Sequence, residues 1–240
     1  MKFDNTEIYG IKSAMRGMRN PLESWSKGDT LGCLEFGECE ICPLYNGREN
    51  CYGDEVVIGK NDMSLAQKLI LAGSEHRKFL RQIFVSVDIT APLYWWKEFD
   101  TYKVGTTANS TSTMHKLSTT PITLDCFEID DADLDLECED THLYANSTIA
   151  LEVESIIDFL EDLRKKYLET KDKRYWKELI RWLPESWLQT RTVTINYENL
   201  YSIYRQRRNH KLTEWSESFI KWVDGLPYSN ELIKCGLEDN

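Results

Sequence analysis

Four cysteines are spaced in a way that could bind a soft metal ion. Cys33, Cys39, Cys42 and Cys51 lie within nineteen residues, with glycines between them. Zinc is held tetrahedrally by four thiolates, and two cysteines separated by two residues supply two of those ligands from one turn. The outer spacings differ from those of common zinc knuckles, so an iron–sulfur cluster and four reduced thiols remain alternatives. A zinc ion closed by four cysteines would be structural, because no coordination position stays open for a substrate.

A second group of residues, rich in arginine, could recognise a phosphate. Its members are Arg191, Asn196, Arg205, Arg207, Arg208, His210 and Glu214. Arginine binds phosphate through two parallel hydrogen bonds, and residues four apart, such as His210 and Glu214, share one helical face. The alternative is structural, because cations at the end of a helix are also favoured by the helix dipole.

The segment from Gly105 to His115 is crowded with hydrogen-bonding side chains. It contains Thr106, Thr107, Asn109, Ser110, Thr111, Ser112, Thr113 and His115. Leucine, tryptophan and phenylalanine precede it at helical spacing. A polar loop after an aromatic helix suits a polar ligand held against the core, although a surface turn rich in Ser and Thr is the common alternative. His115 is compatible with a pocket residue or with a structural histidine.

The elements that must position these residues follow from the spacing of the apolar side chains. Alternation predicts strands, a period near 3.6 predicts helices, and Asn, Gly and Pro mark the ends. Strands are predicted at 6–9, 83–89 and 191–197. Helices are predicted at 11–18, 61–73 with a cap at Asn61-Asp62, from Pro92, and at 148–169, 175–182, 198–208 and 212–223, with a frayed tail. The fold class is therefore α+β, a helix-rich domain around a small mixed or antiparallel sheet.

Composition limits the possible partners. The 240-residue chain has a formal net charge of −11 and is 41% apolar, and nine carboxylates lie between Asp125 and Asp140. Such a surface repels a nucleic-acid polymer but leaves room for a single nucleotide. No apolar run is long enough for a signal peptide or a membrane span, so we expect a cytoplasmic protein with reduced thiols. We expect one domain, 1–240, with a Cys-rich insertion at 27–54 and an acidic segment at 125–140.

Several stretches together resemble the flavin-dependent thymidylate synthase family. VSVDITAPLYWWKEF, from Val85 to Phe99, resembles the family's strand, Ala-Pro turn and helix, and the helix that ends at Gly73 resembles the one before that strand. The family signature R-H-R-x-x-S-x-N-E-x-S-x-R-Y follows, with Asn109 and Ser112 in place. Further matches in the family's order are Leu183-Pro184, Thr190-Arg191, Asn196, Arg207, His210 and Glu214.

The same signature also shows where this chain departs from the family. Ser110 replaces its Glu, Met114 the Arg after the Ser, and His115 its Tyr. The R-H-R half falls near Thr101-Tyr102-Lys103, with a one-residue shift between the two halves. Flavin phosphates need the cations that this half supplies. Lys103 alone is a poor substitute, although Lys12, Arg77, Lys78 and Arg81 could contribute from elsewhere.

The resemblance implies a set of ligand-binding residues. For a pyrimidine nucleotide of the dUMP type they are Arg191, Arg207, Ser112, Asn109 and Ser110. For FAD they are Lys103, Tyr102, His115, Asn196 and His210. No catalytic residue can be assigned, and the family's tetrameric assembly implies a homo-oligomer with the site between subunits.

The implied reaction transfers a one-carbon unit from methylenetetrahydrofolate to the uracil ring and reduces it with a flavin hydride. The leading hypothesis is therefore a divergent flavin-dependent enzyme that acts on a pyrimidine nucleotide. One alternative is a catalytically inactive, nucleotide-binding or ligand-sequestering oligomer of the same fold, since a fold does not determine a function. Another is a zinc-stabilised interaction module centred on the four cysteines.

Overall fold

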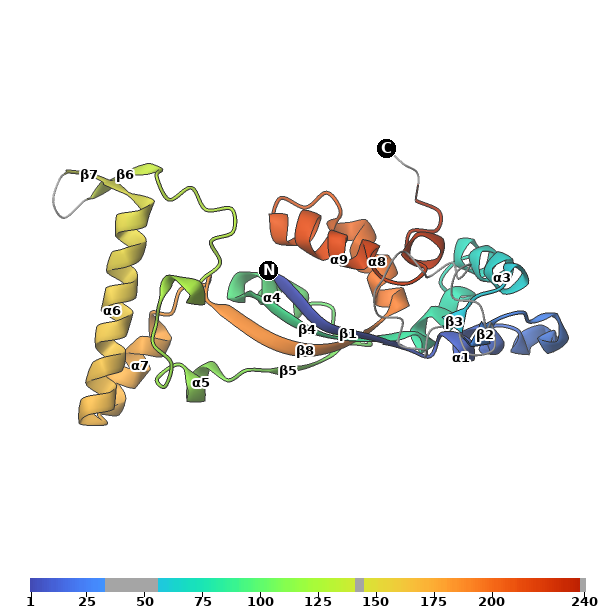
Figure 1. The fold of residues 1–240 in the computed structure, drawn as a ribbon, viewed down its shortest axis with the longest axis horizontal. Coiled ribbons are helices and arrows are strands. Elements are labelled where there is room, and N and C mark those ends of the chain that lie inside the picture. Colours follow the sequence, from blue (N-terminus) through green and yellow to red (C-terminus); the bar gives the residue numbers. More distant parts are fainter. Residues whose placement is uncertain (33–55, 141–144, 238–240) are drawn as a thin grey trace. The chain divides into compact units, whose positions relative to one another are not determined.

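Strands that lie far apart in the sequence build the main sheet. A computed structural model describes residues 1–32, 56–140 and 145–237, and four strands are hydrogen-bonded in the order β1-β4-β8-β5 (Figure 1). Their bounds are β1 Lys2–Tyr9, β4 Phe84–Pro92, β8 Leu188–Asn196 and β5 Thr107–Ser110. No two neighbours in this sheet are consecutive strands, so every pairing depends on a segment that returns from elsewhere in the chain.

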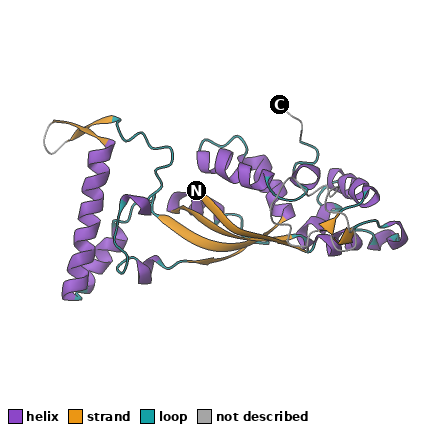
Figure 2. Ribbon diagram, viewed as in Figure 1, coloured by secondary structure: helices purple, strands orange, loops and turns teal. Residues whose placement is uncertain are grey.

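Apolar alternation on the two central strands forms part of the core. Val85, Val87 and Ile89 of β4 are buried, and so are Val193 and Ile195 of β8. Both strands were predicted within three residues of their observed bounds. The α+β class, with helices dominating around a small sheet (Figure 2), is confirmed.

The chain groups into two compact units, the first of which contains Met1–Phe3, Asp88–Thr101 and Ala108–Thr192. Its helices are α4 (Leu93–Phe99), α5 (Thr113–Lys116), the 3₁₀ turn η5 (Leu124–Cys126), α6 (Ile149–Thr170) and α7 (Lys173–Arg181). Helices α6 and α7 lie side by side (Figure 1). One cluster of buried apolar residues joins them to the chain before them: Leu117, Ile122, Phe127, Leu160, Leu163 and Leu179.

Two segments predicted as loops contain regular structure in this unit. The hydroxyl-rich segment forms the exposed strand β5 and then α5, because Thr107–Ser110 pair with β8 and the Ser112 Oγ accepts the His115 backbone N–H at 3.1 Å, as an N-cap. The acidic segment ends in a strand, β6 (Glu137–Asp140), which pairs antiparallel with β7 (Ala145–Thr148). The first prediction failed because β5 pairs with the distant β8, and such a pairing leaves no local sequence signal. The second failed although β7 is nearby, because the carboxylate-rich sequence of β6 is atypical of a strand.

The second unit contains Asp4–Val87, Tyr102–Thr107 and the chain from Val193 onward. Its elements are α1 (Ile11–Gly17), the 3₁₀ turns η1 (Asn20–Leu22), η2 (Trp25–Lys27) and η4 (Arg77–Gln82), the short strands β2 (Leu31–Gly32) and β3 (Val56–Val57), α3 (Lys60–Leu71), α8 (Tyr197–Arg207), the π-helical turn η6 (Glu214–Phe219), α9 (Ile220–Asp224) and the π-helical turn η7 (Ser229–Ile233). The predicted single helix at 212–223 is therefore split between two helix types.

The predicted frayed tail is wrong for the described residues up to 237. Leu232 and Ile233 are buried. The Arg205 guanidinium donates to the backbone carbonyls of Ile233 and Cys235, at 2.7 and 2.6 Å. A buried apolar pair and a charged donor therefore hold this segment against α8.

A buried ion pair joins the N-terminal turns to α3. Arg19 Nε donates to Asp62 Oδ1 at 2.5 Å, and both side chains are buried. The other Asp62 oxygen accepts the backbone N–H groups of Asp29 and Thr30 and the Thr30 hydroxyl. The predicted cap at Asn61-Asp62 is wrong, because the Asp29 carboxylate accepts both N–H groups from outside the helix and Gly59 is the N-cap residue.

The chain segments on either side of residues 33–55 lie next to each other. Strands β2 and β3 pair antiparallel, Leu31 opposite Val57 and Gly32 opposite Val56. The Tyr228 hydroxyl accepts the Ile58 N–H and donates to the Val56 carbonyl, both at 3.0 Å. Residues 33–55, with all four cysteines of the predicted metal site, lie outside the described residues. Within the described part, no helix has the length and apolarity needed to span a membrane.

We predict that Asp62→Asn destabilises the fold by about 3–5 kcal/mol at neutral pH, because it leaves the Arg19 charge buried without a counter-ion. Burial alone would raise the pKa of the Asp62 carboxyl, but the hydrogen bonds from Thr30, Arg19 and Asp29 outweigh it and hold that pKa below its usual value. Wild type should therefore lose stability as the pH falls below about 5, and the variant should lose less. Denaturant unfolding at several pH values measures both effects.

The exposed pair Asp162–Lys166 provides the control for this experiment, because the same substitution at Asp162 removes an ion pair that water already screens. Equal losses of stability in Asp62→Asn and Asp162→Asn would contradict the role given to the buried pair.

A second prediction concerns the insertion. Replacing residues 33–55 by Asn-Gly should convert β2 and β3 into a two-residue hairpin, because that turn joins strands whose ends are already paired. We expect the variant to keep its circular dichroism spectrum and its melting temperature, and to contain no zinc by elemental analysis. Wild type should contain one zinc per chain if the four cysteines bind it. An unfolded variant would show that β2, β3 and Tyr228 do not close this part of the fold by themselves.

Candidate functional site

In the first unit, Arg191 is held on three sides. Its Nε donates to Gln189 Oε1 at 2.9 Å, and its Nη1 donates to Asp100 Oδ1 at 2.7 Å. The guanidinium carbon lies 4.2 Å from the ring centroid of Trp96, a cation–π distance. The side chain is only 15% exposed. Arg191 is therefore a fixed cation with one edge towards solvent.

The strand and helix around Arg191 determine this geometry. Gln189 and Arg191 are two residues apart on β8, so both side chains lie on the same face of the sheet. The Trp96 indole N–H donates to the Gln189 carbonyl at 2.9 Å, and the Gln189 amide donates to the Thr111 carbonyl at 2.9 Å. The buried Trp96 of α4 thus packs against the Arg191 guanidinium. Gln189 links Arg191 to Thr111, the residue that follows β5.

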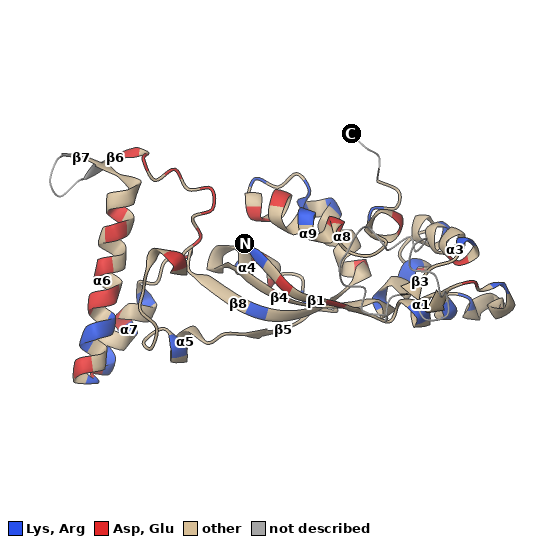
Figure 3. Ribbon diagram, in the orientation of Figure 1, with Lys and Arg blue, Asp and Glu red and all other residues tan. Residues whose placement is uncertain are grey.

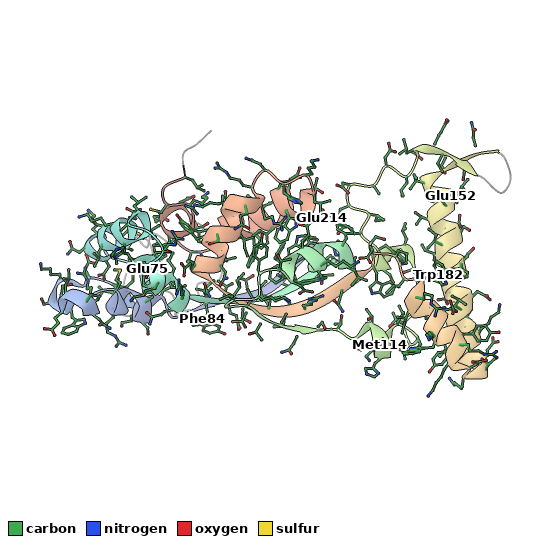
Figure 4. All side chains as sticks on the ribbon, turned by 180° about the vertical axis from the view of Figure 1, so that it is seen from behind. Glu75, Phe84, Met114, Glu152, Trp182 and Glu214 are labelled. Carbon is green, nitrogen blue, oxygen red and sulfur yellow. The ribbon has the colours of Figure 1, made fainter. Side chains whose placement is uncertain are left out.

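The predicted hydroxyl-segment residues belong to the same unit as Arg191. Asn109 and Ser110 are exposed on β5, and Ser112 caps α5. His115 is exposed on α5, the short helix that carries Met114 (Figure 4). The Thr111 N–H donates to the Thr190 carbonyl at 2.9 Å, which joins this segment to the residue before Arg191. The structure therefore brings together one fixed cation and a strand that exposes amide and hydroxyl groups.

In the second unit, the Arg207 side chain contacts two aromatic residues, Tyr102 and Trp215. Arg207 Nε donates to the Tyr102 hydroxyl at 2.8 Å, and that hydroxyl lies 3.0 Å from the Gln206 side-chain oxygen. The Arg207 guanidinium carbon lies 4.7 Å from the Trp215 ring centroid. His210 contacts Trp215 edge to face, and its Nδ1 accepts the Leu212 N–H. Three residues predicted to bind ligand, Tyr102, Arg207 and His210, are thus gathered around one buried tryptophan.

Asn196 and Lys103 occupy different surroundings in that unit. The Asn196 side chain caps α8 by accepting the Asn199 N–H at 3.0 Å, and its amide donates to the Gly105 carbonyl at 3.5 Å. Gly105 has φ +78°, and a Cβ there would lie 2.6 Å from the Asn196 amide nitrogen. Asn196 therefore positions the chain next to the exposed Lys103, and its predicted contact with a cofactor stays a prediction.

A cavity of about 1320 Å³ in the second unit is rich in cations. It is lined by the turns after α1, one face of α3 and the turn η4, and its charged residues are Arg19, Lys27, Lys68, Glu75, Lys78 and Arg81. Glu75, which is labelled in Figure 4, is the single carboxylate among the lining residues that the structure describes. Arg19 pairs with Asp62 and Arg81 pairs with Glu198, whereas the three lysines have no ion-pair partner among the described residues.

The positive charge around this cavity contrasts with the net negative charge of the whole chain. Lys and Arg gather on α1 and the turns that follow it, whereas Asp and Glu crowd the chain before β6 (Figure 3). Sequence reasoning named Lys78 and Arg81 as substitute cations, and both line the cavity. It missed Lys27 and Lys68, because nothing in their local sequence distinguishes them from surface lysines. It also missed Gln189, although its position two residues before Arg191 on a strand was a usable signal.

Arg77 was also named as a substitute cation, but it is engaged elsewhere. Its guanidinium carbon lies 4.3 Å from the Tyr201 ring centroid, and its Nε pairs with Glu198 at 3.4 Å. Lys12 lines a separate cavity of about 360 Å³ with Arg16 and Arg19.

No cluster of three or more His, Cys, Asp or Glu residues is arranged to hold a metal ion in residues 1–32, 56–140 and 145–237. Zinc binding by Cys33, Cys39, Cys42 and Cys51 stays a prediction.

The fold is that of the flavin-dependent thymidylate synthases. One matching structure is the enzyme from Helicobacter pylori in complex with FAD and dUMP. It is 15% identical, and the match covers 98% of this chain and 99% of that one with a TM-score of 0.60. A second structure of the Helicobacter pylori protein with the same two ligands is 14% identical, covers 97% of both chains and gives a TM-score of 0.59. No family model and no curated protein sequence matches the chain.

Proposed function

We propose that this protein binds a pyrimidine nucleotide of the dUMP type together with a flavin, as a divergent homo-oligomer of the thymidylate synthase fold. The observation that carries the proposal is Arg191, a fixed cation on β8 that is linked through Gln189 and Thr111 to a strand of exposed amides and hydroxyls. Arginine and hydroxyl donors are the groups that recognise a nucleotide phosphate and sugar. The two solved structures of the same fold that carry dUMP support this choice of ligand.

Arg207 is the second candidate for the nucleotide. Its guanidinium is stacked on Trp215 and bonded to the Tyr102 hydroxyl, so it is oriented before any ligand arrives. A cation that is already oriented loses less conformational entropy on binding an anion. Ser112, Asn109 and Ser110 complete the proposed nucleotide set.

The flavin half of the proposal depends on cations that replace the missing R-H-R residues. The cavity in the second unit offers Lys27, Lys68 and Lys78, none of which is paired within the described residues. Its volume of about 1320 Å³ exceeds the 300–1,000 Å³ typical of sites for drug-sized ligands. Leu65, Leu69 and Phe79 add apolar lining. The volume and the three lysines support a large anionic ligand in this cavity, and a bound flavin would supply hydride chemistry there.

One observation favours the alternative of a nucleotide-binding protein without thymidylate synthesis. Arg191 already pairs with the Asp100 carboxylate of this chain. A cation that is paired with a carboxylate gains less from a bound phosphate than an unpaired one. Mass spectrometry of ligand released from the denatured protein separates the two functions, because it identifies a flavin, an unmodified nucleotide or neither.

We predict that the purified protein is yellow, with the visible absorbance of a bound flavin, or binds added FAD with quenching of the flavin fluorescence. Lys68→Glu and Lys78→Glu should each weaken FAD binding, because they place a carboxylate beside the flavin phosphates. Lys165→Glu, on an exposed part of α6, is the matched control and should leave the affinity unchanged. A colourless protein that also fails to bind added FAD would rule out the flavin.

We predict that Arg191→Ala and Arg207→Ala each weaken dUMP binding by about 1.5–3 kcal/mol, which is the contribution of one hydrogen bond to a charged group. Isothermal titration calorimetry measures this loss directly. Arg174→Ala is the control, because that side chain is 90% exposed and pairs with Asp172. Unchanged affinity in both test variants would reject the assignment of this site.

A further inference from the structure

The solvent edge of Arg191 is covered by a carboxylate from the same chain. Asp100 Oδ1 accepts from Arg191 Nη1 at 2.7 Å. The Arg191 side chain is 15% exposed, whereas the Asp100 side chain is 54% exposed. The two partners therefore differ: the cation is fixed in the fold, and the anion is at the surface.

Little besides Arg191 holds the Asp100 side chain in place. Arg191 is its single hydrogen-bond or ion-pair partner among the residues that the structure describes. Asp100 is the C-cap residue of α4, where the negative end of the helix dipole disfavours a carboxylate. The carboxylate can thus turn into solvent without breaking another hydrogen bond or ion pair to the described residues.

Arg191, in contrast, keeps its orientation when Asp100 moves away. Gln189 still accepts from its Nε, and the Trp96 ring still covers its face. The side-chain amide of Gln189 is itself held by the hydrogen bond that it donates to the Thr111 carbonyl. The arrangement is a preformed anion site whose present occupant is a tethered carboxylate.

We propose that Asp100 is a specificity-determining residue that occupies the phosphate position on Arg191, so that it lowers the affinity of the site for the nucleotide relative to the corresponding nucleoside. This inference rests on the proposed nucleotide function. A pyrimidine nucleoside meets no opposing charge at Arg191, whereas the corresponding nucleotide must first displace Asp100 and then stays close to its negative charge. Asp100 therefore reduces the preference for the nucleotide over the nucleoside that Arg191 alone would confer.

The test compares dUMP with deoxyuridine, which differ only in the phosphate. Calorimetric affinities are measured for wild type, Asp100→Asn, the double variant Asp100→Asn/Arg191→Ala and the control Asp162→Asn. Asp162 matches Asp100 in exposure, at 56%, and in its 2.7 Å ion pair. Asp100→Asn should bind dUMP about tenfold tighter than wild type and deoxyuridine within about twofold. The double variant should lose the gain, and the control should show none.

The outcomes separate this inference from the function on which it rests. If wild type and Asp100→Asn bind dUMP equally, the phosphate position is not occupied by Asp100 and the inference is overturned, while nucleotide binding stands. If both ligands gain affinity by the same factor, Asp100 acts on the fold and not on the phosphate, which also overturns it. If neither ligand binds any variant, the proposed function itself fails. Asp100→Ser, with the same readout, replaces Asp100→Asn if that variant does not fold.

Discussion

The pairing of β4 with β8 is the constraint on which the rest of the structure depends. About a hundred residues separate these strands in the chain, yet their side chains meet directly: the Thr90 and Thr190 hydroxyls are 2.7 Å apart, and Thr192 donates to Asp88 at 2.6 Å. One strand leads into α4, with its tryptophans, and the other carries the candidate arginine. A shift of one residue in this register would turn Arg191 to the opposite face of the sheet.

Helices and central strands could be predicted from the sequence because their signals are local. The apolar period of α6 and the alternation along β4 are both readable within ten to twenty residues. The alternation corresponds to a buried face of β4, whereas the buried apolar side chains of α6 are Leu160 and Leu163. The Ala-Pro turn after β4 could also be placed, since proline fits the start of a helix. The family resemblance in this region led to the correct fold.

The surroundings of the site could not be predicted, because they depend on side chains that are far apart in sequence. Nothing near Asp100 indicates that it will meet Arg191, ninety-one residues away. Likewise Asp29, and not a residue of α3, caps that helix. Sequence reasoning therefore named Arg191 by resemblance but could not show that its charge is partly neutralised. The predicted roles of Lys103, Asn196 and His115 stay predictions for the same reason.

The C-terminal contacts of the second unit also determine the order in which the chain can fold. Its segments are separated by residues 88–101 and 108–192 of the first unit. Arg205 bonds to the carbonyls of Ile233 and Cys235, and Tyr228 bonds to the chain at Val56 and Ile58. During synthesis the first unit is complete once residue 192 has left the ribosome. The N-terminal segments of the second unit keep apolar surface exposed until residues 193–235 follow, and apolar surface that is exposed during synthesis favours aggregation.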